Sequence, residues 1–214
     1  MSGGRTIMIV GNGDVPDGTG AAIDAADIVV RFNDCRSVGS GGQKTDIVAV
    51  CNTGRPGLAM LGGGCWKTNA AVRQAREIWC VRSGEKFAAM RQGLAETHPD
   101  LDDFCDDYTT GFESFCRSTD RRFRIVPLAV HDELDRELAG LSPDPYVVPS
   151  SGMIVIADIL KHLATAGDDV VLAGFGHVGW QWHPFAAERR HVDALAASGR
   201  LRRLHPISSS SQGA

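Results

Sequence analysis

A histidine and a glutamate five residues apart open the last helical pattern of the chain, in the segment His183-Pro184-Phe185-Ala186-Ala187-Glu188. Histidine titrates near neutrality and is the side chain that most often serves as a general base. Because histidine is a poor helix cap, helix formation alone does not explain its position. Glu188 could orient the imidazole of His183 or hold the helix N-terminus. A surface histidine beside a solvated glutamate is the plain structural alternative.

Two serines and a glycine precede an apolar helical run, in the segment Pro149-Ser150-Ser151-Gly152-Met153. Serine is a favoured N-cap, because its hydroxyl accepts a hydrogen bond from a free N–H group of the first turn. The N-terminus of a helix also presents free N–H groups and a positive dipole end, which suit a phosphate. The segment therefore predicts either ordinary capping or a phosphate site that involves Ser150, Ser151 and Gly152.

Three further segments place glycine, asparagine or arginine at the ends of apolar runs. They are Val10-Gly11-Asn12-Gly13, Arg31-Phe32-Asn33 and Gly174-Phe175-Gly176. Glycine permits a positive φ and a close approach of a ligand to the backbone. Arginine and asparagine can orient a ligand or satisfy buried backbone groups. None of the segments has the spacing of a dinucleotide fingerprint or of a Walker loop, so each is equally consistent with a plain turn after a strand.

Six apolar runs bounded by turn residues predict buried strands, and helical patterns lie between them. The strands are expected at 6–10, 27–32, 46–50, 77–82, 123–126 and 170–173, and the helices at 21–26, 66–75, 84–94, 101–118, 130–141, 153–163 and 185–197. This alternation predicts a Rossmann-like α/β fold with a mostly parallel sheet and helices on both faces. A single domain is expected over 1–207, followed by a polar tail at 208–214. In such a sheet, ligands bind beyond the carboxyl ends of the strands, where the segments above lie.

The composition is that of an ordinary globular protein, with 214 residues, 43% of them hydrophobic and 22% charged, and a formal net charge of −4. No basic stripe is present, so no nucleic-acid partner is expected. The sequence has no run of about 18 apolar residues and no signal-peptide layout, which predicts a cytoplasmic protein without a membrane span. The six cysteines and seven histidines lack metal-ligand spacing, so we expect no metal and free thiols, with Cys51 and Cys80 buried in strands.

Taken together and in this order, the segments resemble the sialyl motifs of the sialyltransferases of glycosyltransferase family 29. Residues 9–45 look like the large motif, residues 149–153 and 170–176 look like the small motif, and His183 with Glu188 matches the very small motif. The resemblance implies a GT-A-like nucleotide-binding fold, a CMP-sialic acid donor and an inverting transfer that needs no metal.

The resemblance also implies a role for each matched residue. Asn12 and Asn33 would contact the phosphate and nucleoside of the donor, Ser150, Ser151 and Gly152 would hold its ribose and phosphate, and Gly174, Phe175 and Gly176 would line the cytosine side. His183 would be the catalytic base, and Gly11, Arg31, His177 and Glu188 would support the site.

The chain departs from the animal members of the family in one motif, which carries a histidine and a tyrosine between the small and very small motifs. Here only the segment His177-Val178-Gly179-Trp180-Gln181-Trp182 separates Gly176 from His183. Either His177 replaces the histidine of that motif or His183 stands for it. We expect Trp180 and Trp182 to stack on a sugar. The stretch 84–145, which matches nothing in the family, could form a lid or an acceptor surface.

The chain resembles still more closely a group of small bacterial proteins called urease operon accessory proteins, a name that states no chemistry. The leading hypothesis is a metal-independent inverting glycosyltransferase that takes a CMP-activated sialic acid-like (nonulosonic) sugar and an unknown glycan or small-molecule acceptor, without a cofactor. The alternative is a non-catalytic accessory protein that binds a nucleotide or a sugar. Either could be a homo-oligomer. A dinucleotide-dependent enzyme is disfavoured, because Arg31-Phe32-Asn33 stands where an acidic residue should end the second strand.

Overall fold

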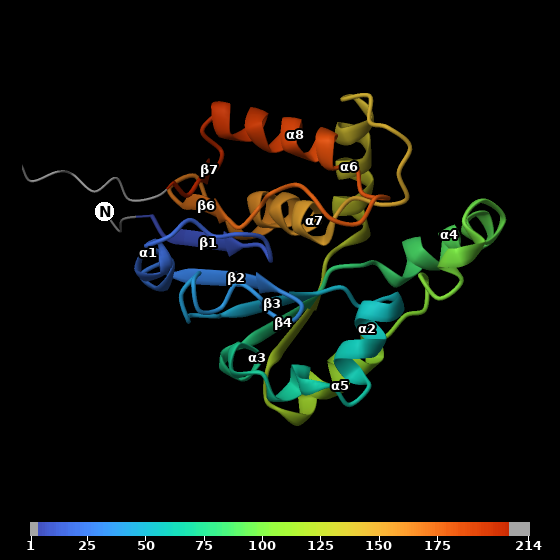
Figure 1. Ribbon diagram of the computed structural model, residues 1–214, viewed down its shortest axis with the longest axis horizontal. Coiled ribbons are helices and arrows are strands. Elements are labelled where there is room, and N and C mark those ends of the chain that lie inside the picture. The colour runs from blue at the N-terminus through green and yellow to red at the C-terminus, as the bar shows by residue number, and fades with distance from the viewer. Residues whose placement is uncertain (1–3, 206–214) are drawn as a thin grey trace, which may run out of the picture.

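A parallel sheet of seven strands forms the centre of the chain in the computed structural model, which describes residues 4–205 (Figure 1). The strand order is β5-β4-β3-β2-β1-β6-β7, and each pair of neighbours is parallel. The predicted Rossmann-like α/β fold is confirmed, and the predicted tail at 208–214 lies outside the described residues. The strands are β1 (Thr6–Val10), β2 (Ile28–Phe32), β3 (Ile47–Val50), β4 (Glu77–Cys80), β5 (Arg122–Ile125), β6 (Asp169–Ala173) and β7 (Arg202–Arg203).

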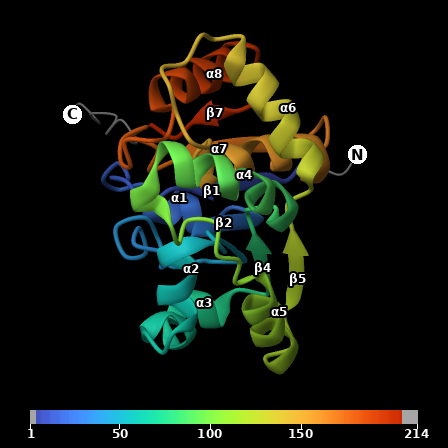
Figure 2. The same cartoon turned by 90° about the vertical axis from the view of Figure 1, so that its right-hand side faces the viewer.

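Helices cover both faces of this sheet (Figures 1 and 2). One face carries α6, α7 and α8, and the other carries α1, α2, α3 and α5, whereas α4 extends away from the sheet beyond the carboxyl ends of the strands. The helices are α1 (Gly20–Asp24), α2 (Gly54–Leu61), α3 (Ala70–Gln74), α4 (Gly84–Thr97), α5 (Thr109–Ser118), α6 (Leu128–Ala139), α7 (Ser151–Asp158) and α8 (Phe185–Ala197), with 3-10 turns η1 (Cys65–Thr68) and η2 (Pro99–Leu101) and a π-helical turn η3 (Ile159–Leu163).

The alternation of side chains along each strand divides the core between the two faces. Ile7 and Ile9 of β1 pack in the cluster that contains α7 and α8. Met8 and Val10 of the same strand pack against Ile23 of α1 on the opposite face. Because both faces are covered, β1, β3 and β6 are buried at successive positions, which explains their nearly continuous hydrophobic runs. The edge strand β5 was also expected to be buried, but it alternates arginine with apolar residues and is partly exposed.

Several helix boundaries differ from those that the sequence predicts. Helix α2 was not expected, because its sequence is rich in glycine and contains proline, and it begins at Gly54 with a φ of +60°. The helix expected at 66–75 is divided into η1 and α3, because Asn69 adopts an extended backbone and caps α3 through its side chain. The helix expected at 101–118 begins only at Thr109, after a series of turns.

Two further expectations concern membrane-spanning helices and the pairing of the cysteines. Within 4–205, no helix combines the length and the apolar character that crossing a membrane requires. All six cysteines lie in this part of the chain and are unpaired, and Cys51 and Cys80 are buried in the sheet region, as predicted.

Candidate functional site

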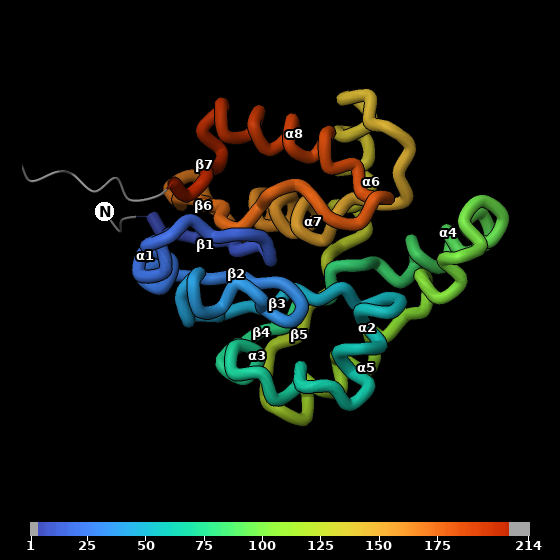
Figure 3. Tube along the Cα trace, viewed as in Figure 1, coloured from blue at the N-terminus to red at the C-terminus, as the bar shows by residue number. Residues whose placement is uncertain are grey.

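A cavity of about 450 Å³ opens at the carboxyl edge of the sheet, where β1 separates the strands β2 to β5 from β6 and β7. Such a switch point is the usual ligand site of an open parallel sheet, because the loops leaving adjacent strands diverge there. Figure 3 shows the segment between β6 and α8 passing over α7, and residues of this segment line the cavity. Twelve of the thirteen predicted site residues line this cavity, namely Gly11, Asn12, Asn33, Ser150, Ser151, Gly152, Gly174, Phe175, Gly176, His177, His183 and Glu188.

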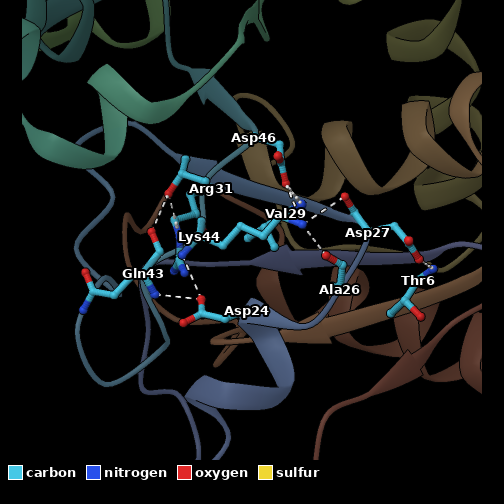
Figure 4. Close-up of polar contacts among 10 residues, drawn as sticks. Thr6, Asp24, Ala26, Asp27, Val29, Arg31, Gln43, Lys44 and Asp46 are labelled. Carbon is cyan, nitrogen blue, oxygen red and sulfur yellow. Dashed lines mark hydrogen bonds and ion pairs between the residues drawn. The ribbon is translucent and has the colours of Figure 1, made fainter.

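Arg31, the thirteenth, does not line this cavity, so it would not contact a ligand there. Its side chain is buried on the face of the sheet opposite α7 and donates hydrogen bonds to the carbonyls of Lys44 (3.0 Å) and Gly41 (2.7 Å) and to the Ser37 hydroxyl (3.1 Å). Figure 4 shows Arg31 above the loop of residues 37–44. Asp24 also holds this loop, because its carboxylate accepts a hydrogen bond from the backbone N–H of Lys44. The strand alternation explains the outcome, because Phe32 rather than Arg31 faces α7.

The glycines of the site serve mainly to let two loops pack closely. The backbone of Gly174 has a φ of +69°, and a Cβ there would lie 2.8 Å from the Gly11 carbonyl oxygen. A Cβ on Gly11 would in turn lie 2.4 Å from the Gly174 carbonyl oxygen. A Cβ on Gly152 would lie 2.7 Å from the Phe175 ring. These positions therefore admit only glycine without rearrangement of the cavity wall.

The two asparagines tie the loops of the cavity together. Asn12 donates to the Phe32 carbonyl (3.2 Å) and accepts from the backbone N–H of Arg36 (3.1 Å). Asn33 adopts a left-handed backbone with a φ of +51°, and its side-chain oxygen accepts from the N–H of Cys51 (2.8 Å). Among residues 4–205, nothing accepts a hydrogen bond from the Asn33 side-chain amide group, which leaves it available to a ligand.

Ser150 and Ser151 have different surroundings at the start of α7. Ser150 is the N-cap, since its hydroxyl accepts from the N–H of Met153 (3.1 Å), and it also donates to Glu188 (2.7 Å). The hydroxyl of Ser151 makes no hydrogen bond with any other described residue and lines the cavity. Ordinary capping therefore accounts for Ser150, whereas Ser151 and the N–H groups beside it remain available for an anion.

Glu188 holds the N-terminus of α7 and does not orient the imidazole of His183. The carboxylate is buried and accepts from the N–H (2.6 Å) and the hydroxyl of Ser150. Burial raises the pKa of Glu188, and the two hydrogen bonds from Ser150 oppose that rise. The sequence left two roles open for this residue, orienting the imidazole or holding the start of its own helix, and the structure instead shows its carboxylate bound to the start of α7.

His183 is oriented by a backbone carbonyl. Its Nδ1 lies 2.8 Å from the carbonyl oxygen of Val148. A carbonyl can only accept, so Nδ1 carries the proton and Nε2 has a free lone pair. Burial lowers the pKa of His183 to about 4, an effect that the Val148 bond opposes and the positive charge of Arg82 reinforces. The imidazole is therefore neutral at pH 7.

The neighbouring aromatic and histidine residues divide into two groups. The edge of Trp180 lies against His183, with ring centres 4.9 Å apart, and Trp180 lines the cavity. Trp182 contacts His98 instead and is not part of this cavity wall, so the cavity gives no support to its expected contact with a sugar. His177 lines the cavity, and its Nε2 accepts from Arg203 (3.2 Å). Burial first, and the charge of Arg203 second, lower the pKa of His177 to about 4.

A second cavity of about 470 Å³ adjoins the first and shares Asn33, Ser151, Trp180 and His183 with it. Its wall includes Arg82, which the sequence analysis placed at the end of a strand and did not connect with the site. The sequence did contain a signal for Arg82, since this charged residue directly follows the apolar run of residues 78–81. No group of three or more His, Cys, Asp or Glu side chains is placed to hold a metal ion anywhere in 4–205.

The fold is that of the sialyltransferases. A mammalian sialyltransferase matches 95% of this chain and 70% of its own chain with a TM-score of 0.54 and 17% identity. An alpha-2,3-sialyltransferase from Campylobacter jejuni matches 97% of this chain and 77% of its own, with a TM-score of 0.53 and 13% identity. At these identities the likeness concerns the fold alone.

The sequence comparison defines the family. The chain is 73% identical over 210 residues to the urease operon 23 kDa accessory protein of Rhizobium meliloti (strain 1021). The matched region covers 98% of this chain and 97% of that protein. The chain therefore belongs to the family of this accessory protein. No family model matches the sequence, so membership of glycosyltransferase family 29 stays a prediction.

Proposed function

We propose that the protein transfers a sialic acid-like (nonulosonic) sugar from its CMP-activated form to an acceptor hydroxyl. The observation that carries this proposal is one cavity, at the switch point of the sheet, that holds both the start of α7 and the unprotonated Nε2 of His183. The fold adds support, since the sialyltransferase CST-II in complex with a trisaccharide acceptor and CMP shares it with a TM-score of 0.51.

The donor phosphate is expected at the N-terminus of α7. The first N–H groups of the helix and the Ser151 hydroxyl form an anion site there. Arg36 lines the same cavity, and its largely exposed guanidinium pairs with Asp34 at 3.2 Å, so a bound phosphate would share this cation with a carboxylate. The nucleoside would then lie along the loop after β6, with Gly174, Phe175 and Gly176 on its cytosine side.

The proposed transfer is a single displacement at the anomeric carbon. The oxygen of the acceptor hydroxyl forms a bond to that carbon while the bond from the carbon to the CMP phosphate oxygen breaks. The electron pair leaves with CMP, and the acceptor proton passes to Nε2 of His183. The N–H groups of α7 stabilise the charge that develops on the phosphate. Because CMP leaves readily with this help, the proposal includes no metal ion and no cofactor.

The environment of His183 suits the role of base in one respect and limits it in another. The Val148 carbonyl fixes the tautomer, so the basic nitrogen faces the cavity without a competing partner. A pKa near 4 makes the free site a weak base at pH 7. A donor phosphate bound nearby would raise this pKa, because a negative charge favours the imidazolium form. Proton transfer is thereby coupled to the presence of the donor.

The experiment that tests the proposal is a calorimetric titration with CMP, UMP, AMP and NAD, followed by an assay of CMP-sialic acid turnover. We expect selective binding of CMP, and we expect His183→Gln to retain this binding while turnover falls by about 10²-fold or more. The matched control is His205→Gln, because His205 is exposed and lies outside both cavities. Equal turnover by His183→Gln and the wild type would remove the base from the proposal.

The name of the Rhizobium relative favours a second candidate, a non-catalytic accessory protein that keeps a nucleotide or sugar pocket. The same experiment separates the two candidates. Binding of CMP without turnover of any CMP-sugar supports the accessory role, whereas binding with turnover that depends on His183 supports the transferase.

A further inference from the structure

The second cavity adjoins the cavity at the switch point, and His183 lines both. Its wall is formed by residues that follow β3 and β4 and by the turn before α5, including Cys51, Gly54, Arg82 and Phe104. In the sheet order, β4 is separated from β1 by β3 and β2. This cavity therefore approaches His183 from the β3 and β4 side of the sheet, whereas the first cavity lies at the switch point beside β1.

Arg82 is a buried cation in the wall of this cavity, with only 5% of its surface exposed. Within 4–205, no carboxylate lies within ion-pair distance of its guanidinium, and its one side-chain hydrogen bond is Nη1 to the Thr53 hydroxyl at 2.7 Å. The nearby thiol of Cys105 does not supply a negative charge, because burial raises its pKa. A buried charge without a counter-charge is costly, so its retention calls for an anion.

The surroundings of Arg82 hold its side chain in one place. Asn52 accepts from its backbone N–H (2.8 Å) and donates to its carbonyl (3.0 Å). The guanidinium carbon lies 4.9 Å from the centre of the Phe87 ring and 4.6 Å from that of Phe104. Both rings pack against the guanidinium, and its N–H groups that do not bond to Thr53 are suited to a two-pronged bond with a carboxylate or phosphate.

Aromatic contacts connect this cation with the proposed base. Phe104, which stacks on Arg82, also stacks on Trp180 with ring centres 5.3 Å apart. Trp180 in turn lies against His183. Both cavities include Trp180, Ser151 and His183, so a molecule in the second cavity can present a group to the base while the first is occupied.

We propose that the second cavity binds the acceptor, and that the acceptor carries an anionic group, a carboxylate or a phosphate, which pairs with Arg82. This inference rests on the proposed function for the identity of the first ligand. Two other arginines line this cavity, and each already has a carboxylate: Arg55 pairs with Asp103 (2.8 Å) and Arg36 with Asp34 (3.2 Å). The unmatched charge therefore belongs to Arg82.

The test compares three monosaccharides that differ in charge: galactose, galacturonate and galactose 6-phosphate. Each is titrated calorimetrically into the wild-type protein with and without saturating CMP, and inorganic phosphate is titrated as a separate arm. We expect both charged sugars to bind at least tenfold more tightly than galactose. Arg82→Gln should abolish this preference, and Arg82→Lys should retain part of it. Arg117→Gln is the control and should change affinity less than twofold, because Arg117 is exposed and lies outside both cavities.

The outcomes separate this inference from the proposed function. If the wild type binds galactose as tightly as the charged sugars, the inference of an anionic acceptor is wrong, whatever the variants do. Tight binding of inorganic phosphate with no preference among the sugars would also overturn it, since Arg82 would then hold a free ion. If Arg82→Gln weakens binding of CMP-sialic acid but not of CMP, the cation serves the donor carboxylate and the inference is wrong. Failure of CMP to bind contradicts the proposed function, whereas the sugar titration without CMP still tests Arg82.

Discussion

The carboxylate of Glu188, on α8, accepts two hydrogen bonds from Ser150, one from the backbone N–H at 2.6 Å and one from the hydroxyl at 2.7 Å. Ser150 caps α7, so this contact joins the start of one helix to the first turn of another. The first turn of α7 forms the wall of the cavity at the switch point of the sheet. The position of that wall therefore depends on a buried side chain 38 residues further along the chain.

We predict that Glu188→Ala lowers the free energy of unfolding by about 2–3 kcal/mol, because two charge-assisted hydrogen bonds are lost and a buried N–H loses its partner. Glu188→Gln should cost less, since one acceptor oxygen remains. Urea denaturation monitored by circular dichroism measures both. Glu113→Ala is the control, because Glu113 forms an exposed ion pair within α5 and should cost about 0.5 kcal/mol or less. A similar loss for Glu113 and Glu188 would contradict the role given to Glu188.

Alanine substitutions at the two serines at the start of α7 should change different properties, namely stability for Ser150 and CMP affinity for Ser151. Ser150→Ala removes the helix cap and a bond to Glu188, so we expect a loss of about 2 kcal/mol of stability. Ser151→Ala removes a hydroxyl without a partner among the described residues, so stability should stay within about 0.5 kcal/mol. If that hydroxyl meets the donor phosphate, CMP affinity should fall about fivefold, which corresponds to about 1 kcal/mol. Thermal denaturation and calorimetry together distinguish the two variants, and unchanged CMP affinity in Ser151→Ala would contradict the phosphate contact.

Two glycines with similar backbones provide a matched pair. Gly174 and Gly18 have φ values of +69° and +75°, so alanine meets the same backbone strain of about 1 kcal/mol at each. A Cβ at Gly18 has no neighbour within 4 Å, whereas one at Gly174 lies 2.8 Å from the Gly11 carbonyl oxygen. We expect Gly174→Ala to cost about 2 kcal/mol more than Gly18→Ala in urea denaturation. Equal costs would show that the two loops can separate without penalty.

The stability of the protein should fall with acid through the buried His131. Burial first, and the charge of Lys86 second, lower the pKa of His131 to about 4, and Asp135 and Asp132 act in the opposite direction. The unfolded chain, with a histidine pKa of about 6.5, takes up the proton first as the pH falls. The stabilising contribution of neutral His131 is therefore present above about pH 6.5 and is lost progressively down to pH 4, at up to about 1.4 kcal/mol per pH unit.

The free energies of unfolding of wild type and His131→Phe between pH 7 and pH 4.5 measure this contribution. We expect a shallower slope for the variant than for the wild type. Identical slopes for the wild type and His131→Phe would show that this imidazole takes up its proton at the same pH in the folded and unfolded protein.

The strand pattern was readable from the sequence for a local reason. Each of the six predicted strands is an apolar run bounded by turn residues, and each lies in the sheet at nearly the predicted bounds. The seventh strand, β7, has two residues and therefore no pattern to detect. Helix α2 was missed because glycine and proline oppose helix formation locally, while Met60 is buried in the core of the folded protein.

The site was predictable in part for the same reason. Side chains at the carboxyl ends of parallel strands must meet at one edge of the sheet, so the loops after β1, β2 and β6 could be placed together from the sequence. Arg31 was misplaced because it lies one residue before the end of its strand, and the alternation directs it to the other face.

The sequence by itself therefore determined the class of fold and the set of segments that gather at one edge, because both follow from periodicity and from the direction of parallel strands. Only the tertiary structure decided that Glu188 binds Ser150 rather than His183, that Val148 fixes the imidazole, and that Arg82 lies buried beside the site without a carboxylate. These relationships join residues far apart in the chain. They depend on how helices and loops pack on the sheet, to within a hydrogen-bond length, and no local pattern carries that information.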